Sequence, residues 1–486
     1  MSTPLFVIDA IRDFARANPD HPALVVGGRG DGPDETIDYA TLVARMEERA
    51  RALVKAGVGA GDRCGLVAPQ GTGFVEAALG ILAAEACFVP IPDGVTGAAL
   101  ERSVRGSSLH HLIERTSDLG CRSFSDVAPV DGSGERVFRA FDPAYMRFTS
   151  GTTNERKGVV VGHAAVAARL ANANAALEIG PGDRVMWLLP MAHHFLVSIL
   201  LYLRAGATIL LPASNFAHDV LALAARARAS VFYASPYHYG VLAKDVSSLG
   251  LESVRLSVST ADGLRASVAA AFRARFALPL VQALGIIEVG LPVVNLESAT
   301  SKPEALGRPG DAYQLWLRDD AGAQVEDPSS AERSGEICIR GSGLFDAYLH
   351  PWTPSRALLE PDGFRTGDQG WFDAEGDLHL AGRRANRINM AGLKFFAEEV
   401  EVVLDSHPGI CSSRVFAREH AQLGEIPAAE FVPSDPEHAP DKRELSRHCR
   451  EQLAAYKVPR EFCVVEALAM TATGKLRRAR ASEDSG

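Results

Sequence analysis

The apolar positions of this chain alternate between strand-like and helix-like spacing. Residues 64–69 form an apolar run, residues 74–86 follow with helical spacing, and residues 87–92 form a second apolar run. This order predicts a strand, a helix and a strand, which together make the βαβ unit of a parallel sheet. The same alternation recurs in residues 185–211 and 230–282. We therefore expect an α/β fold.

The pattern changes in two places. Residues 92–142 give a weak and polar signal, as expected of a linker region with a few local elements. After Arg383 a small α+β unit begins, with a helix expected at residues 398–406 and part of a strand at residues 429–433. A second, smaller unit is therefore expected to follow the larger one.

One polar segment lies between two strand-like runs, residues 144–148 and residues 158–161. It is expected to connect them in a hairpin-like manner. The segment is rich in small and hydroxyl-bearing residues and ends in Lys157. Such a backbone offers N–H and hydroxyl donors together with a positive charge, which suits a loop that holds phosphate. It differs from the P-loop pattern, because Gly158 follows the lysine. An ordinary Ser/Thr/Gly loop is the alternative.

Further motifs follow in order along the chain. Residues 362–368 read Asp-Gly-Phe-Arg-Thr-Gly-Asp, a Gly-Arg pair ends at Arg383, and residues 471–478 read Thr-Ala-Thr-Gly-Lys-Leu-Arg-Arg. Together with the hydroxyl-rich segment, these motifs resemble the adenylate-forming superfamily of acyl-CoA synthetases, aryl-acid ligases, luciferases and peptide-synthetase adenylation domains. The resemblance implies a large N-terminal domain of parallel and mixed sheets with helices, residues 1–382. It also implies a small, mobile C-terminal α+β domain, residues 383–486.

The resemblance implies a site for ATP and Mg²⁺. Asp368 is expected to bind the ribose hydroxyls, a role that suits a carboxylate, although an aspartate in a surface turn is the alternative. Glu288 is expected to bind Mg²⁺ together with Thr152, because Mg²⁺ prefers oxygen ligands and takes few from the protein. The expected ATP-binding residues are Thr149, Ser150, Gly151, Thr152, Thr153, Lys157, Gly285, Asp368 and Arg383.

The residues expected to be catalytic are Lys475, Glu288 and His193. In the family, a lysine on a mobile loop reaches the substrate carboxylate and the α-phosphate, and Lys475 matches it. Its charge would orient two anions that repel one another and would stabilise charge in the transition state. The alternative for Lys475 is a solvated basic tail, since Arg477 and Arg478 are its neighbours.

The acyl pocket and the thiol tunnel are expected on the same grounds. His193 lies in a segment similar to the one beside the acyl carboxylate, although a histidine in an apolar run is often a core residue. Thr260 and Ala261 stand where the family has a loop of smaller residues, so a small or medium acid is expected. Gly392 is expected in the thiol tunnel. The expected pocket residues are His193, Tyr237, Thr260, Ala261 and Gly285.

Some positions depart from the family pattern. Leu284 stands where an aromatic residue packs on adenine, and Ile287 where a threonine meets phosphate. Ala385 occupies the charged pivot of the hinge, and Asn389 replaces a lysine. Hinges need only absorb a change of dihedral angle, so Ala385 is permissible there. The first two departures concern the affinity for adenine. The two in the hinge concern the second half-reaction, in which the acyl group is transferred to its acceptor.

Composition excludes other classes of protein. The net charge of −10 argues against a nucleic-acid partner. Seven cysteines without a CxxC pair indicate neither a disulfide framework nor a zinc site, so a reduced, cytoplasmic protein is expected. The first residues lack the basic region of a signal peptide. Polar and charged residues interrupt the apolar residues 185–211, so no membrane span is expected.

The expected activity is that of an AMP-forming ligase. A small carboxylic acid would react with Mg·ATP to give an acyl adenylate, and the acyl group would pass to the thiol of coenzyme A or of a phosphopantetheinyl acyl carrier protein. Two alternatives stay open. One is an adenylating enzyme whose acceptor is an amine or an internal nucleophile, and the other is a degenerate nucleotide-binding relative.

Overall fold

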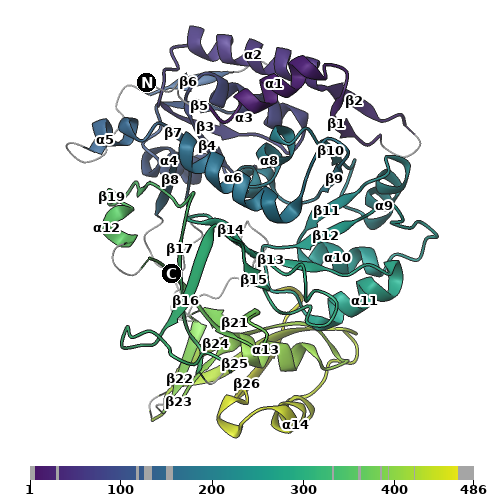
Figure 1. Ribbon diagram of the computed structural model, residues 1–486. Helices are drawn as coiled ribbons and strands as arrows, with labels where there is room; N and C mark the ends of the chain where they lie inside the picture. Colours follow the sequence, from purple (N-terminus) through teal and green to yellow (C-terminus); the bar gives the residue numbers. More distant parts are fainter. Residues whose placement is uncertain are drawn as a thin grey trace.

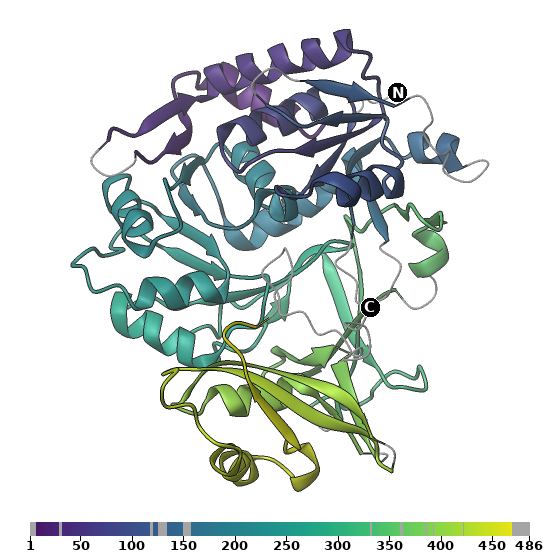
Figure 2. The same cartoon turned by 180° about the vertical axis from the view of Figure 1, so that it is seen from behind.

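The computed structural model describes residues 6–28, 32–116, 120–124, 134–148, 157–330, 333–359, 363–383, 386–391, 393–420 and 422–468. Two large sheets form the upper part of the molecule, a four-stranded sheet lies below them, and the C-terminal sheet lies at the bottom (Figure 1). The view from behind shows the same arrangement (Figure 2).

The eight-stranded sheet contains the first predicted βαβ unit. Across the sheet its strands are β19 (Thr353–Pro354), β18 (Ala347–Tyr348), β8 (Gly158–Gly162), β7 (Pro143–Phe148), β4 (Cys87–Ile91), β3 (Arg63–Val67), β5 (His111–Ile113) and β6 (Cys121–Ser123). β3 and β4 are parallel and are joined through α3 (Thr72–Ala83), as predicted. β7 and β8 are antiparallel, which confirms the hairpin. The other helices of this part are α1 (Asp9–Ala17), α2 (Tyr39–Lys55), α4 (Gly97–Gly106), α5 (Gly134–Ala140) and α6 (His163–Leu177).

The nine-stranded sheet confirms the two later runs of alternating elements. Its order is β15 (Arg308–Pro309), β14 (Gly290–Val294), β13 (Val281–Ile286), β12 (Leu256–Ser259), β11 (Val231–Ala234), β9 (Arg184–Trp187), β10 (Thr208–Leu211), β1 (Pro22–Val26) and β2 (Glu35–Asp38). The pairs from β13 to β1 are parallel. β10, β11 and β12 are buried throughout, which explains the mainly apolar sequence of β10 and β11, whereas β12 alternates apolar residues with the buried Ser257 and Ser259. The accompanying helices are α7 (Met191–His194), α8 (Ile199–Arg204), α9 (Ala217–Arg226), α10 (Pro236–Ala243) and α11 (Ala266–Phe276).

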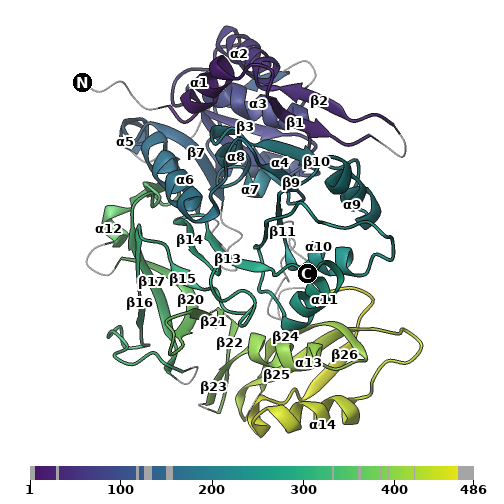
Figure 3. The ribbon, with the colours of Figure 1, turned by 45° about the vertical axis from the view of Figure 1, so that its right-hand side comes forward.

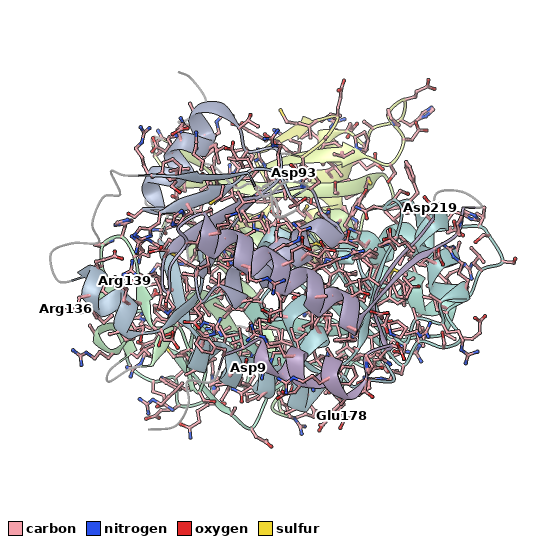
Figure 4. The ribbon with its side chains drawn as sticks, turned by 90° about the horizontal axis from the view of Figure 1, so that it is seen from above. Asp9, Asp93, Arg136, Arg139, Glu178 and Asp219 are labelled. Carbon is pink, nitrogen blue, oxygen red and sulfur yellow. The ribbon has the colours of Figure 1, made fainter. Side chains whose placement is uncertain are left out.

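The linker expected at residues 92–142 contributes more than local elements. β5 pairs in parallel with β3, and β6 pairs with β5, so this region completes one edge of the eight-stranded sheet. Each of these strands has three residues, which is too short for a periodic pattern to be recognised. Figure 4 looks down on the two large sheets, with Arg136 of α5 and Asp219 of α9 at opposite sides of the molecule.

Two smaller sheets follow. The antiparallel four-stranded sheet consists of β16 (Tyr313–Arg318), β17 (Gly335–Gly341), β20 (Phe364–Phe372) and β21 (Leu378–Arg383), and α12 (Arg356–Leu359) precedes β20. The C-terminal sheet consists of β23 (Leu393–Phe396), β22 (Arg387–Met390), β25 (Gly424–Pro433), β24 (Ile410–His420) and β26 (Glu461–Val464). Its helices are α13 (Ala397–Asp405), α14 (Lys442–Gln452) and the 3-10 turn Ala455–Lys457. The helix and the strand expected in this unit are therefore confirmed as α13 and β25.

The C-terminal unit has an apolar core of its own. Among the described residues, this core runs from Ile388 to Val458 and includes Phe395, Leu404 and Phe431. The unit lies below α11 and beside the four-stranded sheet (Figure 3). No helix of the described part of the chain is long and apolar enough to cross a membrane.

Candidate active site

The hairpin of β7 and β8 positions the predicted phosphate loop. Phe148 and Gly158 are the last paired residues before the connecting segment, which therefore begins and ends at neighbouring points of the sheet. Lys157 comes directly before β8, and its Nζ lies 4.9 Å from the centroid of the Tyr348 ring. β18, which carries Tyr348, pairs with β8. A cation over an aromatic face is attracted by the ring, so Tyr348 helps to place the lysine.

Glu288 lies two residues after β13 and is 8% exposed. The Tyr348 hydroxyl donates a hydrogen bond to its Oε1 at 3.0 Å. Burial raises the pKa of Glu288, while the Tyr348 hydrogen bond and the charges of Arg147 and Arg169 act in the opposite direction. The structure therefore brings the predicted metal ligand and Lys157 to the same tyrosine.

Sequence reasoning missed both Tyr348 and Arg169. Tyr348 lies in a two-residue strand far along the chain from the predicted motifs, and a lone tyrosine carries no signal. Arg169 is fully buried on α6 and donates to the carbonyl oxygens of Gly343 at 2.9 Å and Ile287 at 2.9 Å. Burial lowers the pKa of Arg169 to about 10. The signal available for this residue was a single arginine in an alanine-rich helix that contains no lysine, aspartate or glutamate.

The chemistry of this site fits Mg²⁺ that is bound mainly through phosphate. Among the described residues, no group of three or more His, Cys, Asp and Glu side chains could hold a metal ion. Mg²⁺ in nucleotide sites usually takes one or two protein carboxylates and completes its shell with phosphate oxygens and water. One buried carboxylate, Glu288, is consistent with that mode of binding.

A second predicted pair meets at the four-stranded sheet. Asp368 on β20 and Arg383 on β21 are direct partners in the antiparallel ladder. Arg383 Nε lies 3.1 Å from Asp368 Oδ1, and Asp368 is 7% exposed. The arginine thereby orients the carboxylate that is expected to bind the ribose, an arrangement that the two separate motifs did not predict.

The expected acyl-pocket residues have different environments. Thr260 is buried, its Oγ1 donates to the Ala283 carbonyl at 3.1 Å, and a Cβ placed on Gly285 would lie 3.6 Å from that Oγ1. Ala261 has a positive φ of 75°. Tyr237 is 73% exposed and packs edge-on against His238. Tyr239, by contrast, belongs to the core.

His193 lies on α7, and its carbonyl oxygen accepts a hydrogen bond from the Arg147 guanidinium. This contact joins α7 to the end of β7, directly before the predicted phosphate loop. Leu284 and Ile287 are partly buried and pack against the main core. Several predicted residues lie outside the described ones: Thr149, Ser150, Gly151, Thr152, Thr153, Ala385, Gly392 and Lys475.

Comparisons with known proteins identify the family. The family of AMP-binding enzymes matches residues 11–349, and its C-terminal domain matches residues 399–475. Oxalate–CoA ligase of Arabidopsis thaliana is 27% identical and aligns over 96% of this chain and 96% of its own. Sulfoacetate–CoA ligase of Cupriavidus necator is 25% identical, over 95% of this chain and 94% of its own.

Solved structures show the same fold. The crystal structure of an anthranilate CoA ligase in complex with anthranoyl-AMP superimposes with a TM-score of 0.81, at 23% identity, over 98% of this chain and 96% of that one. An o-succinylbenzoate CoA synthetase from Bacillus subtilis, in complex with its acyl-adenylate intermediate, gives a TM-score of 0.82 at 23% identity, over 96% of both chains. Because the family match spans most of its length, the protein belongs to the AMP-binding enzymes, the adenylate-forming superfamily that its motifs resemble.

Proposed function

We propose that this protein is an AMP-forming acid–thiol ligase for a small carboxylic acid. In the first step a carboxylate oxygen attacks the α-phosphorus of ATP, and pyrophosphate leaves with the electrons of the broken P–O bond. In the second step a pantetheine thiol, having lost its proton, attacks the acyl carbonyl carbon and AMP leaves. The observation that carries this proposal is the convergence of Lys157 and Glu288 on Tyr348, beside the hairpin of the predicted phosphate loop.

Each residue of the site has a role in the proposed first step. Glu288 would hold Mg²⁺, which neutralises phosphate charge when it is bound. Lys157 would supply a further positive charge, and Thr149, Ser150, Gly151, Thr152 and Thr153 would supply donors to phosphate. Asp368, oriented by Arg383, would bind the ribose. Lys475 would orient the acid and the α-phosphate.

The acceptor and the size of the acid are inferred from the named relatives and from the residues of the acyl pocket. Two relatives are named as CoA ligases of oxalate and sulfoacetate, which supports coenzyme A as acceptor and a small acid as substrate. A carrier-protein thiol has the same pantetheine chemistry. Gly392 would line the path of the thiol, and Thr260 and Ala261 would shorten the acyl pocket.

The organisation of the chain is part of the proposal. The separate core of the C-terminal unit supports a boundary between residues 382 and 383, with a mobile second domain. Seven free cysteines support a reducing, cytoplasmic location.

Pyrophosphate release tests the proposal. The protein would be assayed with Mg·ATP and a panel of short-chain, dicarboxylic and aryl acids, with and without coenzyme A. We expect release that depends on one class of acid and is stimulated by coenzyme A. Lys475→Ala should lower the rate by about 10²-fold or more while ATP binding persists, because the lysine acts on the transition state. Release without any response to a thiol would favour an amine or internal acceptor.

A degenerate nucleotide-binding protein would give another result. It would bind ATP without releasing pyrophosphate with any acid, and Lys475→Ala would change nothing. That outcome would refute the ligase.

A further inference from the structure

Arg147 is the second-last residue of β7 and lies directly before the predicted phosphate loop. Side chains two apart on a strand share a face, so Arg147 lies on the same face of β7 as Tyr145, opposite to Met146 and Phe148. Phe148 packs with the cluster around Phe138 and Trp352 on the other face. Arg147 therefore belongs to the face of the sheet that meets α7 and Glu288.

The guanidinium of Arg147 contacts neutral groups. It donates to the His193 carbonyl and acts on the Tyr145 side chain, and its Nε is buried without a hydrogen-bond partner among the described residues. Glu288 acts on it electrostatically. Arg63, by contrast, forms an ion pair with Glu135 at 2.9 Å. A partly buried cation that forms no such ion pair among the described residues is suited to bind an anionic ligand.

Two hydrogen-bond donors near His194, on Trp187 and Tyr202, have no partner among the described residues. The Trp187 ring lies 6.4 Å from the His194 ring and 6.4 Å from the Tyr202 ring. Trp187 and Tyr202 are almost completely buried, and the indole Nε1 and the Tyr202 hydroxyl have no hydrogen-bond partner among the described residues. Both donors are enclosed by the main core, whereas the Arg147 side chain is only partly buried, so Arg147 is a group of this region that a ligand can reach.

We propose that Arg147 is a specificity-determining residue that binds a second anionic group of the acid. The substrate class is then a small acid that carries a carboxylate or sulfonate in addition to the carboxylate that is adenylated. This inference rests on the proposed ligase activity and deepens it. Lys157 and Glu288 with Mg²⁺ serve the phosphates, and Arg147 serves the part of the acid that does not react.

Matched pairs of acids test this assignment. The pairs are malonate with propionate, succinate with butyrate, and sulfoacetate with propionate, each with Mg·ATP and pyrophosphate release as the readout. Wild-type protein should prefer the doubly charged member of at least one pair by about 100-fold in kcat/KM, the size expected for a charged hydrogen bond. Arg147→Met should abolish the preference by raising KM for the doubly charged acid, and Arg147→Lys should retain part of it. The singly charged acid is the internal control, because any effect of the variant on the use of ATP and Mg²⁺ through Glu288 is common to both members of a pair.

Control variants separate specificity from folding. Arg16→Met removes an exposed arginine of α1, and all kinetic constants should stay as in the wild type. If Arg147→Met unfolds, Arg147→Gln gives a second variant, which keeps a donor for the His193 carbonyl but removes the charge, and it should lose the preference for the doubly charged acid.

Other results would overturn the assignment. A wild-type preference for the singly charged member of every pair would do so. So would an Arg147→Met variant that loses activity equally with both members, because the arginine would then serve the reacting carboxylate or the phosphate. If no acid supports pyrophosphate release, the ligase proposal itself fails and takes this inference with it.

Discussion

At the scale of single residues, the proposed metal site depends on a buried carboxylate, Glu288, that would have to be charged to bind Mg²⁺. Desolvation favours the neutral form of Glu288 and raises its pKa. The hydrogen bond from Tyr348 and the charges of Arg147 and Arg169 favour the ionised form. Mg²⁺ binding requires the ionised form, so these partners would tune the proposed metal site.

Tyr348→Phe should therefore impair metal use at low pH. Loss of the hydroxyl removes one interaction that lowers the pKa of Glu288, so the pKa rises further and the carboxylate ionises only at higher pH. We expect the acidic limb of the kcat/KM profile for pyrophosphate release to move up by about one pH unit, and the Mg²⁺ requirement to increase about tenfold near neutral pH. Pyrophosphate release measured against pH and Mg²⁺ concentration checks this.

Tyr39→Phe is a matched control, because the buried Tyr39 hydroxyl donates to the carbonyls of Leu203 and Ala207 far along the chain from the site. It should lower stability without moving the pH profile. An unchanged profile for Tyr348→Phe would contradict the role assigned to the Tyr348 hydrogen bond.

At the scale of elements, the end of β21 carries Arg383, the partner of Asp368, and lies against the C-terminal unit. Gly382 precedes Arg383 and has a φ of 151°, in the region that favours glycine. A Cβ at this position would lie 2.7 Å from Glu398 Oε2 and 2.9 Å from Phe396 Cβ. Phe396 ends β23 and Glu398 belongs to α13, so glycine permits the close approach of the C-terminal unit.

Gly382→Ala should disturb both stability and activity. The added methyl group must displace Phe396 or Glu398, which we expect to cost about 1–3 kcal/mol. It should also shift Arg383 and so raise KM for ATP. Thermal unfolding and the kinetics of pyrophosphate release measure the two effects.

Gly106→Ala provides the comparison, because a Cβ there meets no other atom within 4 Å. That variant should change stability by less than about 1 kcal/mol and leave KM for ATP unaltered. Equal behaviour of the two variants would show that the approach at Gly382 is less close than the structure indicates.

At the scale of the whole molecule, charged pairs join the two units. Arg387 and Lys394 of the C-terminal sheet lie 2.9 and 3.1 Å from the Asp320 carboxylate, and they lower the pKa of Asp320 to about 2. Arg265, just before α11, lies 2.8 Å from Asp405 at the end of α13. Exposed ion pairs such as those of Asp320 contribute little to stability. They therefore influence the relative position of the two units more than they hold the units together.

Asp405 makes stability depend on pH. Burial raises its pKa to about 6, against the opposing charge of Arg265. The folded state therefore binds this proton more tightly than the unfolded state does. The resulting stabilisation is complete below about pH 4 and is lost as the pH rises through about 6, and it amounts to at most about 3 kcal/mol.

Asp405→Asn should remove that dependence. Relative to the variant, wild-type protein should lose stability between about pH 4 and pH 6, as measured by denaturant unfolding at a series of pH values. Arg265→Met should move the loss to higher pH, because the charge that lowers the pKa of Asp405 is gone. Parallel stability curves for wild type and Asp405→Asn would contradict this account.

The sequence by itself determined the class of the fold and predicted residues of the site. Apolar runs long enough to show a period predicted parallel strands such as β11, because burial on both faces favours continuous apolar sequence. Short motifs, such as those that end at Asp368 and at Arg383, predicted nucleotide-binding residues through their resemblance to a family. The family matches then confirmed the superfamily that these motifs indicated.

Only the tertiary structure decided which distant residues meet. Tyr348 reaches Glu288 because β18 pairs with β8, and Arg169 reaches Ile287 from the middle of α6. The short strand β5 belongs to the eight-stranded sheet because it pairs in parallel with β3, although its three residues show no periodic pattern. Such contacts arise from packing and strand pairing between segments far apart in the chain. The local pattern of apolar and polar residues does not predict them.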